Sequence, residues 1–268
     1  LLAWLDGAGP KPDVSEAVTF HPVMLSHSLE EADYKHINPP DWQAEWKYDG
    51  IRVQLVSTAK GKALFSRTGD DISHSFPDII EATDFHAVLD GELLVLRDGE
   101  IGSFNALQQR LGKKAPSKKL MQTNPAGLMI YDALAFDDLA ITDLSLVQRR
   151  EQLELWAAKQ APACMQLSEL VAFDDIAHLN QLRTASDDRR ESQLIEGVML
   201  KRKAGSYIPG RPKGEWFKWK RDAMTVDAVI MYAQRGHGKR SSYYSDYTFG
   251  LWDDKTLKPI GKAYSGFT

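Results

Sequence analysis

One stretch of alternating side chains constrains the fold more than any other part of the sequence. Residues 42–47 read Trp, Gln, Ala, Glu, Trp, Lys, so that apolar and polar side chains alternate. A period of two predicts a half-buried β-strand. An Asp-Gly pair follows at positions 49 and 50 and predicts a turn. Lys47 is therefore expected near a strand end, on the same face as Glu45, where a reactive side chain can meet a ligand.

Further segments continue the strand pattern, with helical segments between them. Strands are predicted at residues 51–57, 63–66, 87–96, 127–136, 195–202, 216–220 and 226–232. The first two flank a polar segment with a glycine and predict a hairpin. Amphipathic patterns predict helices over residues 143–159 and 174–184.

Length and composition narrow the class of protein. The chain has 268 residues, which suits one large domain or two modest ones. No apolar run approaches the roughly 20 residues that span a bilayer, which argues against a membrane protein. A single cysteine, Cys164, excludes internal disulfides and Cys-based zinc sites. The net charge of −4 gives no global sign of nucleic-acid binding, so any such role must depend on local basic patches.

Paired charges recur on the predicted strands. Asp90 and Glu92 share one face of an apolar strand, an expensive arrangement unless they meet a cation, a metal or ligand hydroxyls. Lys218 and Lys220 share one face of an alternating strand, where two parallel ammonium groups suit phosphate binding. Taken singly, each pattern is about as well explained by a solvated strand face.

The order of these segments resembles that of the covalent nucleotidyltransferases, which include ATP-dependent DNA ligases, RNA ligases and mRNA capping enzymes. The resemblance is carried by six collinear segments, at residues 47–52, 66–69, 89–93, 128–134, 196–201 and 217–220. Residues 104–114 and 236–250 are similar to stretches typical of bacterial ATP-dependent DNA ligases. The second of these resembles the opening strands of the ligase OB-fold domain.

The resemblance implies an α+β fold and a domain order. Residues 20–221 would form an ATP-grasp-like adenylation domain of antiparallel sheets flanked by helices, and residues 222–268 the first part of an OB-fold β-barrel. Residues 1–19 would be a tail or the end of an upstream domain. A further basic motif of the OB domain would lie beyond Thr268, so we expect a fragment of a longer cytosolic chain.

The family's residue roles fall on ten positions. Lys47 would attack the α-phosphate of ATP, expel pyrophosphate and hold AMP through a phosphoramide bond. The other implied roles are adenine recognition by Glu45, base stacking by Tyr131, contacts with nucleotide or nick phosphates by Arg52 and Arg67, ribose binding by Glu92, phosphate binding by Lys218 and Lys220, and binding of Mg²⁺ or Mn²⁺ by Glu196 and Glu92. Arg211 falls where the family has an arginine upstream of the paired lysines.

The implied function is a DNA ligase that uses ATP to seal 5′-phosphate/3′-hydroxyl nicks in duplex DNA, as a cytoplasmic monomer of the bacterial cytosol or nucleoid. Basic residues concentrated in residues 201–221 and in a cluster of Lys113, Lys114, Lys118 and Lys119 suit phosphate-backbone contacts. The lysine cluster is equally well explained as a solvated loop. Two alternatives stay open: an RNA ligase or GTP-using capping enzyme, and a non-catalytic, nucleotide-dependent DNA-binding module.

Overall fold

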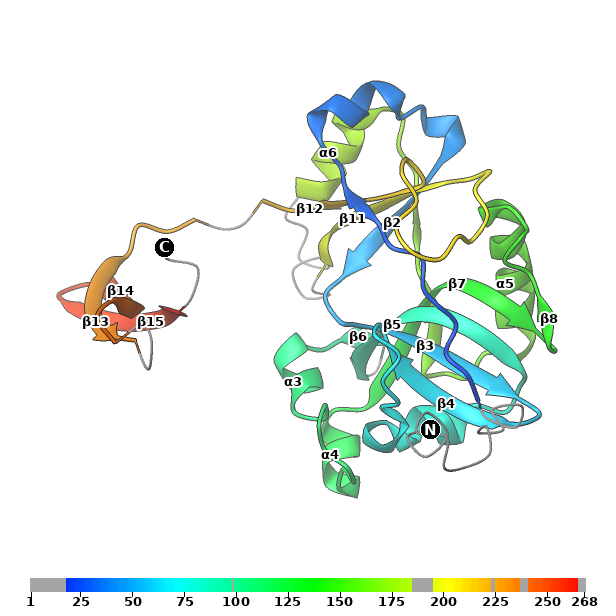
Figure 1. The fold of residues 1–268 in the computed structure, drawn as a ribbon, viewed down its shortest axis with the longest axis horizontal. Coiled ribbons are helices and arrows are strands. Elements are labelled where there is room, and N and C mark those ends of the chain that lie inside the picture. Colours follow the sequence, from blue (N-terminus) through cyan, green and yellow to red (C-terminus); the bar gives the residue numbers. More distant parts are fainter. Residues whose placement is uncertain (1–17, 98, 185–194, 223–224, 237–240, 265–268) are drawn as a thin grey trace, which may run out of the picture. The chain divides into compact units, whose positions relative to one another are not determined.

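The computed structural model describes residues 18–97, 99–184, 195–222, 225–236 and 241–264. Most of the predicted N-terminal tail and residues 237–240 of the OB-like stretch lie outside the described residues. The chain divides into two compact units, residues 1–221 and 222–268 (Figure 1).

The first sheet of the larger unit has seven strands. It contains β4 (Gly61–Ser66), β3 (Ile51–Thr58), β5 (Ala87–Arg97), β7 (Ala126–Phe136) and β8 (Leu139–Ala140) in that order, with β6 (Glu100–Ile101) on β5 and β9 (Met165–Leu167) on β7. Of the strand pairs in this sheet, β7–β9 is parallel and the others are antiparallel. The predicted hairpin is confirmed, because β3 and β4 pair from Val53 opposite Ser66 to Thr58 opposite Gly61.

The second sheet has five strands. Its order is β1 (His27–Ser28), β12 (Trp216–Lys220), β11 (Ile195–Arg202), β2 (Trp42–Tyr48) and β10 (Leu170–Val171). The prediction that residues 42–47 form a half-buried strand is wrong in one respect, because Gln43 and Glu45 are buried as well as the apolar residues. Strand β2 lies between β11 and β10, and Glu45 lines a pocket instead of facing open solvent.

The helices lie at the sides of these sheets (Figure 1). They are α2 (Pro77–Ala82), α3 (Phe104–Gln108), α4 (Lys118–Thr123), α5 (Leu146–Gln160) and α6 (Ile176–Thr184), with 3₁₀ turns η1 (Glu31–His36), η2 (Pro39–Asp41) and η3 (Ser73–Ser75). Helix α5 begins three residues later than predicted, because Ser145 caps it in a reciprocal capping box with Gln148. No helix of the described residues is long and apolar enough to cross a membrane.

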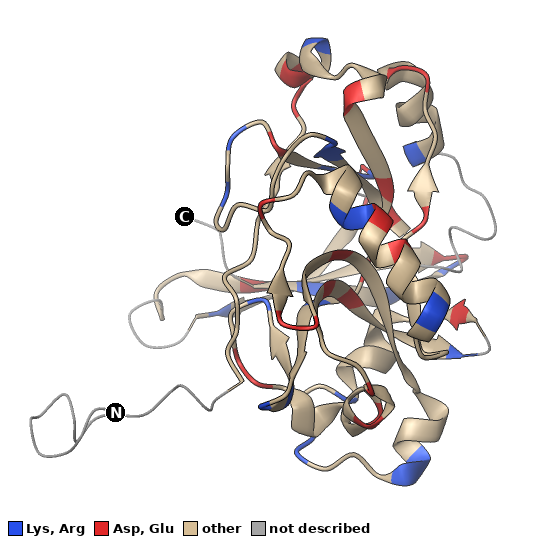
Figure 2. Ribbon diagram, turned by 90° about the vertical axis from the view of Figure 1, so that its right-hand side faces the viewer, with Lys and Arg blue, Asp and Glu red and all other residues tan. Residues whose placement is uncertain are grey.

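Separate apolar cores support the two sheets. Leu153 and Trp156 of α5 pack in the core of the seven-stranded sheet. Leu179 of α6 packs in the core of the five-stranded sheet, together with Val198 and Leu200 of β11. Lys and Arg are interspersed with Asp and Glu along the described ribbon (Figure 2), in keeping with the small net charge of −4.

The smaller unit is an antiparallel meander. It contains β13 (Val229–Arg235), β14 (Tyr244–Asp253) and β15 (Thr256–Tyr264), with β14 in the middle. Strand β13 begins three residues later than predicted. The two mostly antiparallel sheets of the larger unit, with helices at their sides, give the α+β class that the resemblance implied.

Candidate active site

A pocket with a volume of about 470 Å³ is lined by strands of both large sheets. All ten predicted site residues line it: Glu45, Lys47, Arg52, Arg67, Glu92, Tyr131, Glu196, Arg211, Lys218 and Lys220. These residues come from positions as distant as 45 and 220. The fold therefore assembles side chains that the sequence places far apart.

Lys47 and Lys220 lie on the two strands that flank β11. In the five-stranded sheet its backbone is opposite Gly197 of β11, and Gly197 is opposite Lys220 of β12. Glu196 bridges the two lysines, because Oε1 accepts from the Lys47 amine and Oε2 lies 2.7 Å from Nζ of Lys220. Burial would raise the pKa of Glu196, but the hydrogen bonds and charges of Lys220 and Lys47 bring it below its usual value.

A break in the strand ladder aims Glu196 at these lysines. The β2–β11 register shifts between Ile195 and Gly197, which marks an irregularity of the bulge type. Gly197 has φ +150°, and a Cβ there would lie 2.2 Å from the carbonyl oxygen of Trp219. This close backbone approach requires glycine at position 197.

Three further cations line the pocket without an anionic partner. Among the described residues, no ion pair involves Arg67, Arg211 or Lys218. Burial lowers the pKa of Lys218, and the charges of Arg211, Lys220 and other cations lower it further. Such a group of unneutralised positive charges favours a polyanionic ligand.

Glu45 is held by a buried ion pair. Both of its carboxylate oxygens lie close to Nζ of Lys201, at 2.9 and 3.0 Å, and Gln43 Nε2 donates to Oε1 over 2.7 Å. The Lys201 amine lies 4.5 Å from the centre of the Tyr131 ring and 4.8 Å from that of Trp216. The adenine-recognition candidate thus already binds a cation on β11.

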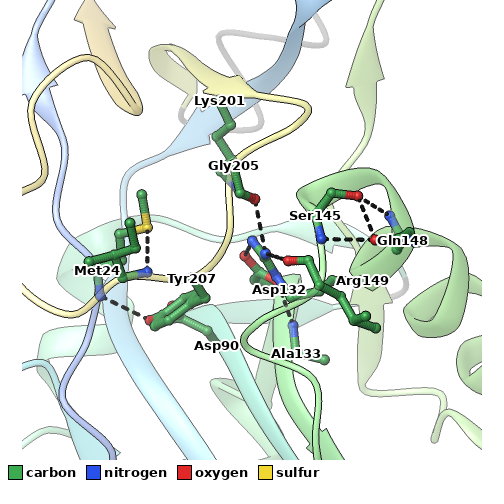
Figure 3. Close-up of polar contacts among 12 residues, drawn as sticks. Met24, Asp90, Asp132, Ala133, Ser145, Gln148, Arg149, Lys201, Gly205 and Tyr207 are labelled. Carbon is green, nitrogen blue, oxygen red and sulfur yellow. Dashed lines mark hydrogen bonds and ion pairs between the residues drawn. The ribbon is translucent and has the colours of Figure 1, made fainter.

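Arg52 also binds a carboxylate, that of Asp90. Its Nε and Nη2 bind the two oxygens of Asp90, at 3.0 and 2.7 Å. The Tyr207 hydroxyl donates to Asp90 over 2.7 Å and accepts from the backbone N–H of Met24 (Figure 3). The expectation that the paired acids of β5 meet a cation therefore holds for Asp90.

A further ion pair, also buried, anchors the loop between β11 and β12. Arg149 of α5 binds both oxygens of Asp132 on β7, at 2.8 and 2.9 Å, and Nη1 donates to the carbonyl oxygens of Leu144 and Gly205 (Figure 3). Because that loop also carries Arg211, this pair helps to place the loop at the pocket.

Glu92 is a third carboxylate at the pocket, after Glu45 and Glu196. Burial raises its pKa to about 7, and the charges of Lys47 and Arg52 oppose the rise only in part. Among the described residues, no cluster of three or more His, Cys, Asp or Glu could hold a metal ion. The donor set of Glu92 and Glu196 nevertheless fits Mg²⁺, which proteins commonly bind through one or two carboxylates together with substrate phosphates.

The sequence interpretation did not assign functional roles to several residues of this network. It counted Lys201 among the basic residues of 201–221 that suit phosphate-backbone contacts, which is wrong for this lysine because it is buried and paired with Glu45. It did not single out Tyr207, Asp132 or Arg149. The usable signal for Lys201 was a lysine in a strand that is otherwise apolar, since a buried lysine needs an anion. For Asp132 on β7 and Arg149 in the first turn of α5, which are separated by the end of β7, by β8 and by a loop, no local pattern identified the pairing.

The fold and pocket define the nucleotidyltransferase class of proteins, in which antiparallel sheets surround a lysine at a cationic pocket. A family model described as "ATP dependent DNA ligase domain" matches residues 23–220. The chain therefore belongs to the ATP-dependent DNA ligase family.

Individual relatives agree with this assignment. A protein of Koribacter versatilis named "Probable DNA ligase" is 32% identical over 271 residues, which cover 93% of this chain and 47% of that protein. The chain thus spans about half the length of this relative. A solved mycobacterial DNA ligase D complexed with ATP and MES aligns with a TM-score of 0.58 and 23% identity, covering 92% of this chain and 73% of that one. A solved Lig E DNA ligase aligns with a TM-score of 0.64 and 17% identity, over 93% and 86% of the two chains.

Proposed function

We propose that this chain contains the core of an ATP-dependent DNA ligase that forms a covalent lysyl-AMP on Lys47 and seals 5′-phosphate/3′-hydroxyl nicks in duplex DNA. One observation carries the proposal: the amine of Lys47 lies in a pocket whose cations Arg67, Arg211 and Lys218 form no ion pair among the described residues. A lysine nucleophile beside unneutralised cations suits attack on a phosphate ester.

The first step would link Lys47 to the nucleotide. Its amine nitrogen would form a bond with the α-phosphorus of ATP, while the bond from that phosphorus to the pyrophosphate oxygen breaks. The amine must also release one proton, to solvent or to the carboxylate of Glu196 that accepts its hydrogen bond, because a protonated amine has no free electron pair. Lys218 and Arg211 would stabilise negative charge that develops on the phosphoryl oxygens.

Other pocket residues would orient the nucleotide. Tyr131 offers a ring for stacking with the base, Glu45 offers acceptor oxygens, and Glu92 is placed for the ribose or the metal. Bound Mg²⁺ would be held by Glu92 and Glu196 and would supply Lewis-acid stabilisation of phosphate charge.

The later steps would use DNA. AMP would pass from Lys47 to the 5′-phosphate of the nick, and the 3′-hydroxyl would then displace AMP to form the phosphodiester bond. Arg52 and Arg67 are the candidates for the nick phosphate, although two nitrogens of Arg52 already bind Asp90. The exposed lysines of α4 and the turn before it could add contacts with the DNA backbone, which give affinity without reading sequence.

We also propose that residues 20–221 form the adenylation domain and residues 222–268 the beginning of an OB-fold domain. The division of the chain at Arg221 and Asp222 supports this assignment. The meander of β13, β14 and β15 supports an OB-type beginning, because such domains are antiparallel barrels. The cytoplasmic location and the monomeric state stay predictions.

The decisive experiment is incubation of the protein with α-³²P-labelled ATP or GTP and Mg²⁺, followed by denaturing electrophoresis. We expect label on the protein from ATP, and transfer of that label to nicked DNA with a 5′-phosphate. Label from GTP instead would favour a capping-type enzyme, and transfer to nicked RNA alone would favour an RNA ligase. Absence of a covalent adduct with either nucleotide would contradict the proposal and favour a non-catalytic module.

A further inference from the structure

Lys201 occupies an unusual place for a lysine. Its side chain is almost completely buried, and residue 201 as a whole is 1% exposed. Strand β11 places it opposite Gln43 on β2 and opposite Trp216 on β12. Two aromatic rings and one carboxylate therefore surround the amine, which has little access to water.

Glu45, the carboxylate that binds Lys201, lines the pocket and has few hydrogen-bond acceptor positions left for a ligand. An ionised carboxylate has about four acceptor positions on two oxygens. Oε1 of Glu45 accepts from both Gln43 and Lys201, whereas Lys201 is the only donor to Oε2 within the part of the chain that the structure describes. Glu45 also lines the pocket, so its remaining capacity, chiefly on Oε2, is available to a hydrogen-bond donor of a bound ligand.

Stability alone gives a poor reason for this arrangement. Burying two charges costs desolvation that their attraction repays only with good geometry, and a well-packed apolar pair is often as stable or more so. A cation that binds both oxygens of Glu45 does have one clear effect, which is to fix the carboxylate in direction. An ionised carboxylate can only accept hydrogen bonds.

We propose that Lys201 is a positioning residue for base selection, because it holds Glu45 as an acceptor-only group at the edge of the nucleotide base. Such a group favours adenine, whose amino group donates, and rejects guanine, whose carbonyl accepts at the equivalent position. The inference rests on the proposed function, since it requires a purine nucleotide in this pocket.

Removal of Lys201 should change the chemistry of Glu45 as well as its position. A carboxylate left in this buried place without its cation is expected to take up a proton. The protonated group carries an O–H donor that can pair with the guanine carbonyl. The other groups that interact with the pair do not replace the lysine: Gln43 is neutral, and burial raises the pKa of Tyr48 to about 12.

The test compares Lys201→Met, Glu45→Gln and the double variant with the unchanged chain, as single-turnover covalent labelling by ATP and by GTP. We expect Lys201→Met to lower the ratio of ATP to GTP kcat/KM by roughly 10- to 100-fold. Glu45→Gln should lower it at least as much, because its amide can donate to the guanine carbonyl. In the Glu45→Gln background, the added Lys201→Met change should leave the ratio within about twofold.

The outcomes separate this inference from the proposed function. If the unchanged chain takes no label from ATP, the proposed function fails. If it takes label and Lys201→Met keeps the full preference for ATP, the inference fails. A further large fall in the double variant relative to Glu45→Gln would also overturn it, since Lys201 would then act on the base independently of Glu45. If Lys201→Met does not fold, the double variant is used in its place, because it leaves no buried carboxylate without a cation. Its ratio of ATP to GTP kcat/KM is then compared with that of Glu45→Gln.

Discussion

Lys47 donates its amine hydrogen bond to Oε1 of Glu196, so the predicted nucleophile is bound to the carboxylate predicted to hold a metal. Lys220 binds the other oxygen of the same carboxylate at 2.7 Å. Cations thus already gather at Glu196 in the protein alone. Catalysis would require Lys47 to release a proton, because its electron pair must become free to attack phosphorus.

Replacement of Lys47 tests the nucleophile directly. Lys47→Ala should abolish covalent labelling by ATP, because only the amine can form the phosphoramide. Lys47→Arg should fail as well, since a guanidinium stays protonated and cannot attack. Far-ultraviolet circular dichroism should show an unchanged fold, because the Lys47 side chain is 21% exposed and lies at the pocket.

A matched control for this experiment is Lys119→Ala, which removes an exposed lysine of α4 away from the pocket lining. Labelling should be within about twofold of that of the unchanged chain. Adenylate that survives on the Lys47→Ala protein would contradict the assignment of the nucleophile.

Glu196→Gln tests the carboxylate that bridges the two lysines. The amide keeps the size of the side chain but loses the charge that binds Lys47 and Lys220. We expect the labelling rate to fall by about two to three orders of magnitude, a loss typical of removing a group that positions or stabilises the transition state. A titration with Mg²⁺ should also show half-maximal labelling at a higher metal concentration. An unchanged rate and metal response would exclude a catalytic role for Glu196.

Much of the larger unit could be predicted from the sequence, because its strands carry strong local patterns. The hairpin of β3 and β4 and the long strands β5 and β7 were predicted within a residue or two of their observed bounds. The gathering of the ten site residues could be expected only from the resemblance to a family, since periodicity alone says nothing about which strands become neighbours.

The remaining differences have physical reasons in tertiary structure. The alternating pattern predicts that Gln43 and Glu45 face solvent. Both are buried, and Glu45 pairs with Lys201, which lies 156 residues further along the chain. The start of α5 depends on the hydroxyl of Ser145, which ends the preceding loop by binding a backbone N–H of the first turn. The amphipathic pattern of residues 143–159 continues past this cap and therefore predicts a helix that begins three residues too early.

Glu92 predicts a pH dependence of stability. Its pKa is about 7 in the folded chain and near its usual value of 4.5 when unfolded, so the folded state binds the proton more tightly. Stability should therefore fall as pH rises from about 4.5 to 7 and then level off. Urea unfolding at pH 5 and pH 8 should show the unchanged chain losing about 1–3 kcal/mol relative to Glu92→Gln. Parallel pH profiles for the two proteins would contradict a raised pKa.

The buried pair of Arg149 and Asp132 predicts a large effect on stability. Both side chains are at most 1% exposed, and two hydrogen bonds of 2.8 and 2.9 Å join them. Asp132→Asn should cost about 3–5 kcal/mol of unfolding free energy, because it leaves the guanidinium buried without its counter-charge. The double variant Asp132→Asn, Arg149→Met should recover much of this loss, since it removes the stranded charge.

The same pair should also affect the pocket through the loop that Arg149 holds. Arg149 donates to the carbonyl oxygen of Gly205, and this loop carries Tyr207 to Asp90 and Arg211 to the pocket lining. The double variant should therefore fold but label more slowly with ATP, because the hydrogen bonds from Arg149 to Leu144 and Gly205 are lost. Urea unfolding gives the stability and single-turnover labelling gives the rate for each variant. A double variant that is no more stable than Asp132→Asn alone would show that the loss comes from the missing hydrogen bonds and not from an unpaired charge.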